Sequence, residues 1–128
     1  MERAEYLPTP ASTTGLKLPF SEAVRVGDVL YLSGSIGLDS SGVLVGGGIE
    51  PETHQTLANM RAVLERHGSS MDRVIKCTLM LADMAERPAM NGVYLQHFTT
   101  NLPARSAFGT SGLALGARVE IECIALIG

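Results

Sequence analysis

Two residues near the end of the sequence, Arg105 and Glu120, have side chains suited to chemistry on a small carboxylic acid. Arg105 is the only charged residue between positions 104 and 117. A guanidinium group presents five donors in a rigid fork and stays charged at any relevant pH, so it suits the binding of a carboxylate. Glu120 follows fifteen residues later and is able to position a water molecule or accept a proton. Either residue alone fits a surface or structural role at least as well. The interpretation of the two as parts of one site therefore depends on the rest of the sequence.

The segment around Glu120, residues 118–127, alternates as a β-strand does. One face is uniformly apolar and is expected to meet the helices; it comprises Val119, Ile121, Cys123, Ala125 and Ile127. The other face changes from charged to apolar along the strand; it comprises Arg118, Glu120, Glu122, Ile124 and Leu126. Such a face suits a subunit interface with a polar pocket at one end. The alternative is that this face lies in no interface and that Glu120 and Glu122 simply face water.

Turn residues and hydrophobic periodicity divide the chain into two helices and about six strands. Strands are expected over residues 21–26, 29–36, 73–81, 105–110 and 118–127, with a short one at 43–45. One helix is expected to begin near Pro51 and end at Gly68, and a second to cover residues 88–98. The order β-β-(β)-α-β-α-β-β predicts one α+β domain over residues 1–128, a mixed sheet covered on one face by two helices. Residues 1–17 are expected to form an irregular N-terminal arm.

The composition limits the partners that this chain could have. The net charge is −3, and three Phe, three Tyr and no Trp leave little for base stacking, so we expect no nucleic-acid partner. Charged residues make up only 18% of this small chain, which indicates that some apolar surface is buried against another subunit. No apolar run approaches the roughly 20 residues of a membrane span. With no apolar signal segment at its acidic N-terminus, the protein is expected to be soluble, cytoplasmic and free of membranes.

No metal or organic cofactor is expected. His54, His67 and His97 share no ligand spacing, and neither Cys77 nor Cys123 has a second cysteine close by in the sequence. Both cysteines lie among apolar residues in predicted strands, so we expect buried free thiols, in keeping with a reducing cytosol.

Seven segments, taken in order, resemble the RidA/YjgF family of enamine/imine deaminases over about residues 18–126. They are PFSEAV (19–24), GDVLYLSG (27–34), GIE (48–50), VIKCT (74–78), MNGVY (90–94), PARS (103–106) and VEIECIA (119–125). Each segment alone is a weak signal, but the set in this order is specific. The resemblance implies a chorismate-mutase-like fold assembled as a homotrimer, with sites in the clefts between subunits. It also implies hydrolysis of 2-imino acids, formed from enamines, to 2-oxo acids and ammonia, without a cofactor.

The resemblance also implies roles for individual residues. Arg105 matches the arginine that binds the substrate carboxylate, and Glu120 matches the acidic residue that orients or activates water. Phe20 would pack against the substrate, the backbone at Gly34 would line the cleft, and Asn91 would lie near the pocket.

Four positions depart from the pattern of many family members. Ala107 stands where a cysteine is frequent, and Phe20 where a tyrosine is frequent. Ser35 replaces a common glutamine and Gly37 a frequent proline. Ser35 and Ala107 remain candidate pocket residues, but these changes leave the range of substrates open. Two other functions therefore stay open as well: a regulatory trimer that binds a 2-oxo acid without turnover, and an endoribonuclease or translation inhibitor.

Overall fold

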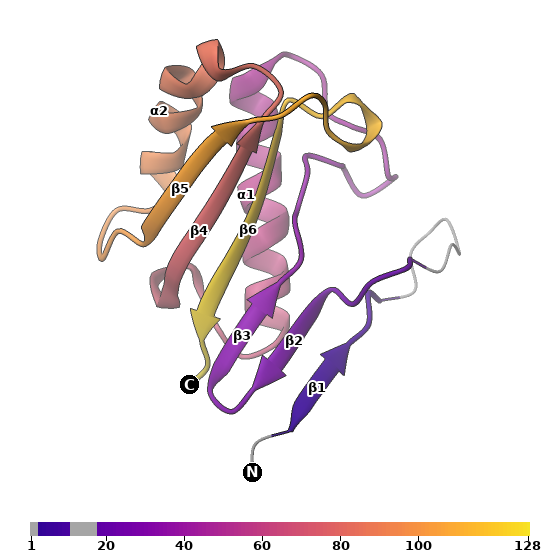
Figure 1. Cartoon of the computed structure of the whole chain (residues 1–128), viewed down its shortest axis with the longest axis vertical. Helices are drawn as coiled ribbons and strands as arrows, with labels where there is room; N and C mark the ends of the chain where they lie inside the picture. The colour runs from indigo at the N-terminus through magenta and orange to yellow at the C-terminus, as the bar shows by residue number, and fades with distance from the viewer. Residues whose placement is uncertain (1–2, 11–17) are drawn as a thin grey trace.

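A six-stranded sheet carries two helices on one of its faces (Figure 1). The computed structural model describes residues 3–10 and 18–128. The strands are β1 (Ala4–Leu7), β2 (Ala23–Val26), β3 (Val29–Leu32), β4 (Val74–Leu81), β5 (Ala104–Gly109) and β6 (Val119–Leu126). The helices are α1 (Ile49–Arg66) and α2 (Arg87–His97), and short 3₁₀ turns occupy Met71–Arg73, Met84–Glu86 and Ala114–Gly116. The expected α+β architecture is confirmed.

The strand order of the sheet is β1-β2-β3-β6-β4-β5. Every neighbouring pair is antiparallel except β4 and β5, which run parallel. Helix α2 makes the crossover between these two parallel strands, as a parallel pair requires. The sheet is therefore mixed, as expected, and its last strand in sequence lies between β3 and β4.

The predicted N-terminal arm is wrong at residues 4–7. These residues form β1, which pairs antiparallel with β2 at the edge of the sheet. Three of its four side chains are exposed, so the strand shows none of the apolar alternation by which a sequence reveals a strand. Residues 11–17 of the predicted arm lie outside the described residues.

The short strand predicted at residues 43–45 is also absent. Only one isolated bridge, between Leu38 and Leu44, forms there. The Asp39 carboxylate accepts hydrogen bonds from the backbone N–H groups of Ser41 and Val43, which closes a tight turn. Because the Val43 N–H is bonded to this side chain, it is not available to a backbone carbonyl, and the pairing does not extend into a ladder.

The hydrophobic core lies between the helices and the sheet. Leu57, Met60 and Leu64 of α1 are fully buried, as the predicted apolar stripe requires, whereas Val63 is only half-buried. The thiols of Cys77 and Cys123 lie opposite each other on β4 and β6, and both are free and buried, as expected. Burial raises the pKa of Cys77 to about 11, so this thiol stays protonated and unreactive at neutral pH.

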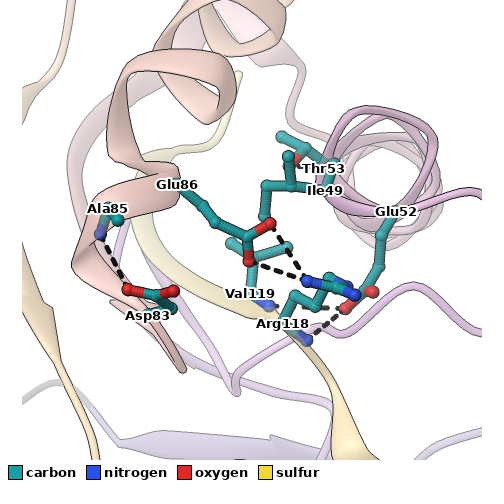
Figure 2. A network of polar contacts seen from close by, with 8 residues as sticks. All are labelled: Ile49, Glu52, Thr53, Asp83, Ala85, Glu86, Arg118 and Val119. Atoms are coloured by element: carbon teal, nitrogen blue, oxygen red, sulfur yellow. Dashed lines mark hydrogen bonds and ion pairs between the residues drawn. The ribbon is translucent and has the colours of Figure 1, made fainter.

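A buried carboxylate holds the start of β6 in place (Figure 2). Glu52 of α1 is 2% exposed, and its Oε1 accepts hydrogen bonds from the backbone N–H groups of Arg118, at 2.5 Å, and Val119, at 3.3 Å. The Arg118 guanidinium in turn forms an ion pair with Glu86, beside α2. These bonds tie α1 and the segment before α2 to the two residues that precede Glu120. They therefore fix the backbone position from which the Glu120 side chain extends.

Replacing Glu52 with alanine should destabilise the fold strongly. Two backbone donors would lose their acceptor, and each buried unpaired donor costs about 1–3 kcal/mol, so the free energy of unfolding should fall by roughly 2–6 kcal/mol. Glu52→Gln keeps one side-chain oxygen and should lose less. Urea unfolding followed by circular dichroism measures the change. Glu50→Ala, which alters an exposed residue in the same helical turn, is the control; equal losses in Glu50→Ala and Glu52→Ala would contradict the role of the buried carboxylate.

Candidate functional site

A pocket of about 440 Å³ opens beside β6, where the chain leaves β3 and passes α1. Four of the residues predicted for the site line it: Phe20, Gly34, Ser35 and Glu120. Much of the remaining wall is apolar, from Leu18, Ile36, Leu38, Val63 and Leu115. The pocket therefore combines a polar group on the sheet with space for an apolar substituent.

Two carboxylates reach this pocket, and only one of them is free to act on a ligand. Glu22 accepts hydrogen bonds from the side chains of Arg66 and His67, so its charge is already paired. Glu120 has no ion-pair partner within residues 3–10 and 18–128. Burial, and then the nearby negative charge of Glu122, raises the pKa of Glu120. An unpaired carboxylate with a raised pKa is suited to accept a proton.

Gly34 lies directly against the Glu120 carboxylate. The next residue, Ser35, exchanges two backbone hydrogen bonds with Ile121, at 2.8 and 3.0 Å, which fixes the two segments side by side. A Cβ atom at Gly34 would overlap the Glu120 Oε2 atom. The Glu120 carboxylate can therefore keep this position only while residue 34 has no side chain.

Gly34→Ala should displace the Glu120 side chain while leaving the sheet paired. We expect the function of the pocket to fall at least tenfold, because small displacements of a reacting group have large effects on rate. Gly46→Ala is the control, since a Cβ atom at Gly46 meets nothing within 4 Å. Binding and turnover of small acids by both variants, with circular dichroism to check folding, make the comparison. A Gly34→Ala protein as active as Gly46→Ala would contradict this account of the pocket.

Arg105 lies on the face of the sheet that the helices cover, whereas Glu120 lies on the open face. In the parallel β4–β5 pair it is the partner of Cys77, whose side chain faces the helices. Its guanidinium carbon stands 4.9 Å above the centre of the Tyr94 ring of α2. No carboxylate in the described parts of the chain pairs with it. A half-buried guanidinium that stacks on an aromatic ring but lacks an anion is suited to bind one.

Further polar atoms accompany Arg105. The Oδ1 atom of Asn91 and the hydroxyl of Tyr94 are buried and have no hydrogen-bond partner among the described residues. These two residues are three apart in α2 and so lie on one face of the helix. Ala107 is two residues beyond Arg105 on β5, on the same face of the sheet, and its methyl group leaves the surroundings open. Buried unpaired polar atoms beside a free charge are typical of a binding surface that awaits its ligand.

The seven predicted site residues thus fall into two groups. Phe20, Gly34, Ser35 and Glu120 line the pocket, whereas Asn91, Arg105 and Ala107 lie between β5 and α2. Glu120 pairs with Met80 on the face that the helices leave open, two strands from β5. Strand spacings alone put the Cα atoms of Arg105 and Glu120 on the order of 14 Å apart. One copy of the chain therefore cannot apply both side chains to one small molecule.

Sequence reasoning missed three contributors to these sites. Tyr94 supplies a ring under Arg105, Glu122 raises the pKa of Glu120, and Leu115 forms part of the pocket wall. The spacing of Tyr94 from Asn91 could have pointed to it, as could the position of Glu122 beside Glu120 on one strand face. Leu115 lies in a 3₁₀ turn at φ 58°, and nothing in the sequence marks it.

Within residues 3–10 and 18–128, no group of three or more His, Cys, Asp or Glu side chains is placed to hold a metal ion. None of the helices in that part of the chain is long and apolar enough to cross a membrane.

Comparison with known proteins shows the family. The sequence profile of the family described as Endoribonuclease L-PSP matches residues 13–127. The human protein named 2-iminobutanoate/2-iminopropanoate deaminase is 42% identical over 119 residues, which cover 92% of this chain and 87% of that protein.

Two crystal structures have the same fold. The Rid-family protein YyfA of Yersinia pestis has a TM-score of 0.88 and 33% identity, covering 98% of this chain and 100% of that one. For RidA of a Psychrobacter species these values are 0.81 and 30%, covering 95% and 94%. The chain therefore belongs to the Endoribonuclease L-PSP family, which is the RidA/YjgF family.

Proposed function

We propose that this protein hydrolyses 2-imino acids to 2-oxo acids and ammonia. The observation that carries the proposal is its 42% identity, over 92% of the chain, to a human protein named for this activity. The geometry supports it independently, because Arg105 offers a guanidinium to a carboxylate and Glu120 a carboxylate to a water molecule, and neither has an ion-pair partner among the described residues.

The proposed reaction uses Arg105 to bind and Glu120 to activate. Arg105 binds the substrate carboxylate through paired hydrogen bonds, with Asn91 and Tyr94 offering further polar contacts. Glu120 accepts a proton from water as the water oxygen bonds to the imine carbon. Glu120 returns this proton to the nitrogen, which then carries three hydrogens. The carbon–nitrogen bond breaks and ammonia leaves, while the hydroxyl group on the carbon gives its remaining proton to Glu120 and becomes the carbonyl. A protonated imine is already electrophilic, so positioning and one proton acceptor are sufficient.

The site is proposed to form between copies of the chain in a homotrimer. Arg105 and Glu120 lie on opposite faces of one sheet, so a shared substrate requires the β5 edge of one copy to approach the pocket of the next. The open face of the sheet supports this assembly. It exposes Tyr31, Phe108 and Leu126, at 36–46% of their surface, and apolar surface of this kind favours an interface.

A coupled assay tests the proposed activity. An amino-acid oxidase generates imino acids from alanine or 2-aminobutyrate, and semicarbazide traps those that the protein does not hydrolyse. Purified protein should lower the semicarbazone signal in proportion to its concentration. An unchanged signal across several imines, together with saturable binding of 2-oxobutyrate, would instead support the regulatory trimer. RNA incubated with the same preparation tests the ribonuclease named in the family description, for which the net charge of −3 offers little electrostatic support.

The activity should be lost on the acid side at a higher pH than an ordinary glutamate would give. Glu120 must be ionised to accept a proton, and its pKa is raised by burial and by Glu122. Glu122→Gln removes one of the two causes, so the acid limb of kcat/KM should move to lower pH. Glu65→Gln, on the exposed side of α1, is the control. An acid limb that is the same in all three proteins would contradict the assignment of that limb to Glu120.

The protein is also proposed to work in a reducing compartment such as the cytosol. Cys77 and Cys123 lie directly opposite each other on neighbouring strands and are nevertheless free thiols. Cysteines on facing positions of neighbouring strands are expected to stay as free thiols where the surroundings are reducing.

A further inference from the structure

The fold brings together two histidines that lie far apart in the sequence. His54 lies on α1, and His97 is the last residue of α2. The Nδ1 atom of His54 is 2.9 Å from the Nε2 atom of His97. The ring centroids are 5.1 Å apart and the ring planes are inclined by 54°. His54 is exposed and His97 half-buried, so the pair can be reached from solvent.

This nitrogen–nitrogen distance is close to that of two imidazoles bound to one metal ion at adjacent positions. Metal–imidazole bonds are about 2.0–2.1 Å long. At that length, nitrogens 2.9 Å apart subtend an angle of about 90° at the metal. Tetrahedral coordination would separate them to about 3.3 Å. An angle near 90° fits square-planar or octahedral coordination, which favours Cu²⁺ and Ni²⁺ over Zn²⁺.

We propose that His54 and His97 form a two-histidine site for Cu²⁺ or Ni²⁺, with water completing the coordination. Each ring binds through the nitrogen that now faces its partner. The proton held between these nitrogens moves to the outer nitrogen of the same ring, so metal binding to the neutral pair releases no proton. The ion would link α1 to the end of α2, on the side of the molecule opposite the open face of the sheet (Figure 1).

The surrounding charges set the strength of this site. Arg61 repels a bound cation, whereas Glu65 lines the same hollow as Arg61 and His97 and opposes that repulsion. Removing the Arg61 charge should therefore strengthen binding.

The test uses full-length, tag-free protein at neutral pH, titrated calorimetrically with nickel chloride and, separately, with copper chloride. We expect one ion per chain, and a Cu²⁺ electron paramagnetic resonance signal coupled to two nitrogens. His54→Gln and His97→Gln should each weaken binding on the order of 100-fold, because the second imidazole binds intramolecularly. Arg61→Gln should bind more tightly than the wild type, and His67→Gln should match the wild type.

Circular dichroism verifies that each variant is folded. An affinity in His54→Gln or His97→Gln equal to that of the wild type would overturn the proposal, as would coupling to a single nitrogen in the wild type. Metal binding does not depend on imine hydrolysis, so these outcomes are independent of the proposed deaminase activity.

Discussion

Arg105→Ala should lose about 30-fold to 4,000-fold in kcat/KM for imino acids, the equivalent of removing one partner from a desolvated charge pair worth about 2–5 kcal/mol. The loss follows from the position of Arg105, whose charge no carboxylate in the described residues neutralises. The fold should survive, because the only contact of this guanidinium that the structure identifies is its stacking on Tyr94. Such an exposed or half-exposed contact is worth about 0.5–1 kcal/mol. The semicarbazide competition assay measures the loss.

Two variants give this measurement its controls. Arg87→Ala removes an exposed arginine at the start of α2 and should keep wild-type activity. Arg105→Lys keeps the positive charge but loses the paired geometry, so its activity should lie between those of the wild type and Arg105→Ala. Gel filtration checks the assembly of each protein. If Arg105→Ala were fully active, Arg105 would have no part in binding the substrate.

Mixed assemblies of two inactive variants should recover activity. Arg105→Ala and Glu120→Gln each damage one half of the proposed site, and each half comes from a different copy of the chain. If both proteins are coexpressed in equal amounts, about a quarter of all inter-subunit sites should combine an intact Arg105 with an intact Glu120, and within each mixed trimer about one site in three should do so. Each variant alone should retain roughly a hundredth of the activity or less. The rise in the mixture is therefore expected to be large, on the order of 25-fold.

The recovery distinguishes sites between subunits from sites within one subunit. Coexpressed proteins carrying differently sized tags are separated so that only mixed assemblies are assayed. As a control, mixing Arg105→Ala with a chain that carries both substitutions should give no recovery, since no copy then has an intact Arg105. If the Arg105→Ala and Glu120→Gln mixture stayed as inactive as its components, the proposed inter-subunit site would be wrong.

The fold was largely predictable because burial follows simple periodicities in this chain. The last strand alternates strictly, and four of its five predicted helix-facing residues are buried: Val119, Ile121, Cys123 and Ala125. The fifth, Ile127, lies just beyond the end of β6 and is half-buried. The apolar stripe of α1 is equally regular. The first strand, Ala4–Leu7, could not be predicted in the same way. It is held by backbone pairing with β2 while most of its side chains are exposed, and backbone pairing leaves little trace in residue types.

The identities of the candidate site residues were predictable, but their arrangement was not. Arg105 and Glu120 stand out by charge and resemblance, yet the face of the sheet that each occupies depends on register. Shifting β5 by one residue against β4 would move Arg105 to the face of Glu120. Likewise, the spacing of His54 and His97 in the sequence suggests no common site, and only the packing of α1 against α2 brings them together.

The position of β6 also constrains how the chain can fold during synthesis. This strand follows the other five strands in the sequence, yet it lies between β3 and β4. Until residues 119–126 have left the ribosome, the β1–β3 hairpins and the β4–β5 unit have no strand to join them. Both would meanwhile expose unpaired edges, β3 in one and β4 in the other, which favour pairing with other chains. The sheet should therefore close only after β6 has left the ribosome, and truncations that remove β6 should aggregate rather than form a smaller domain.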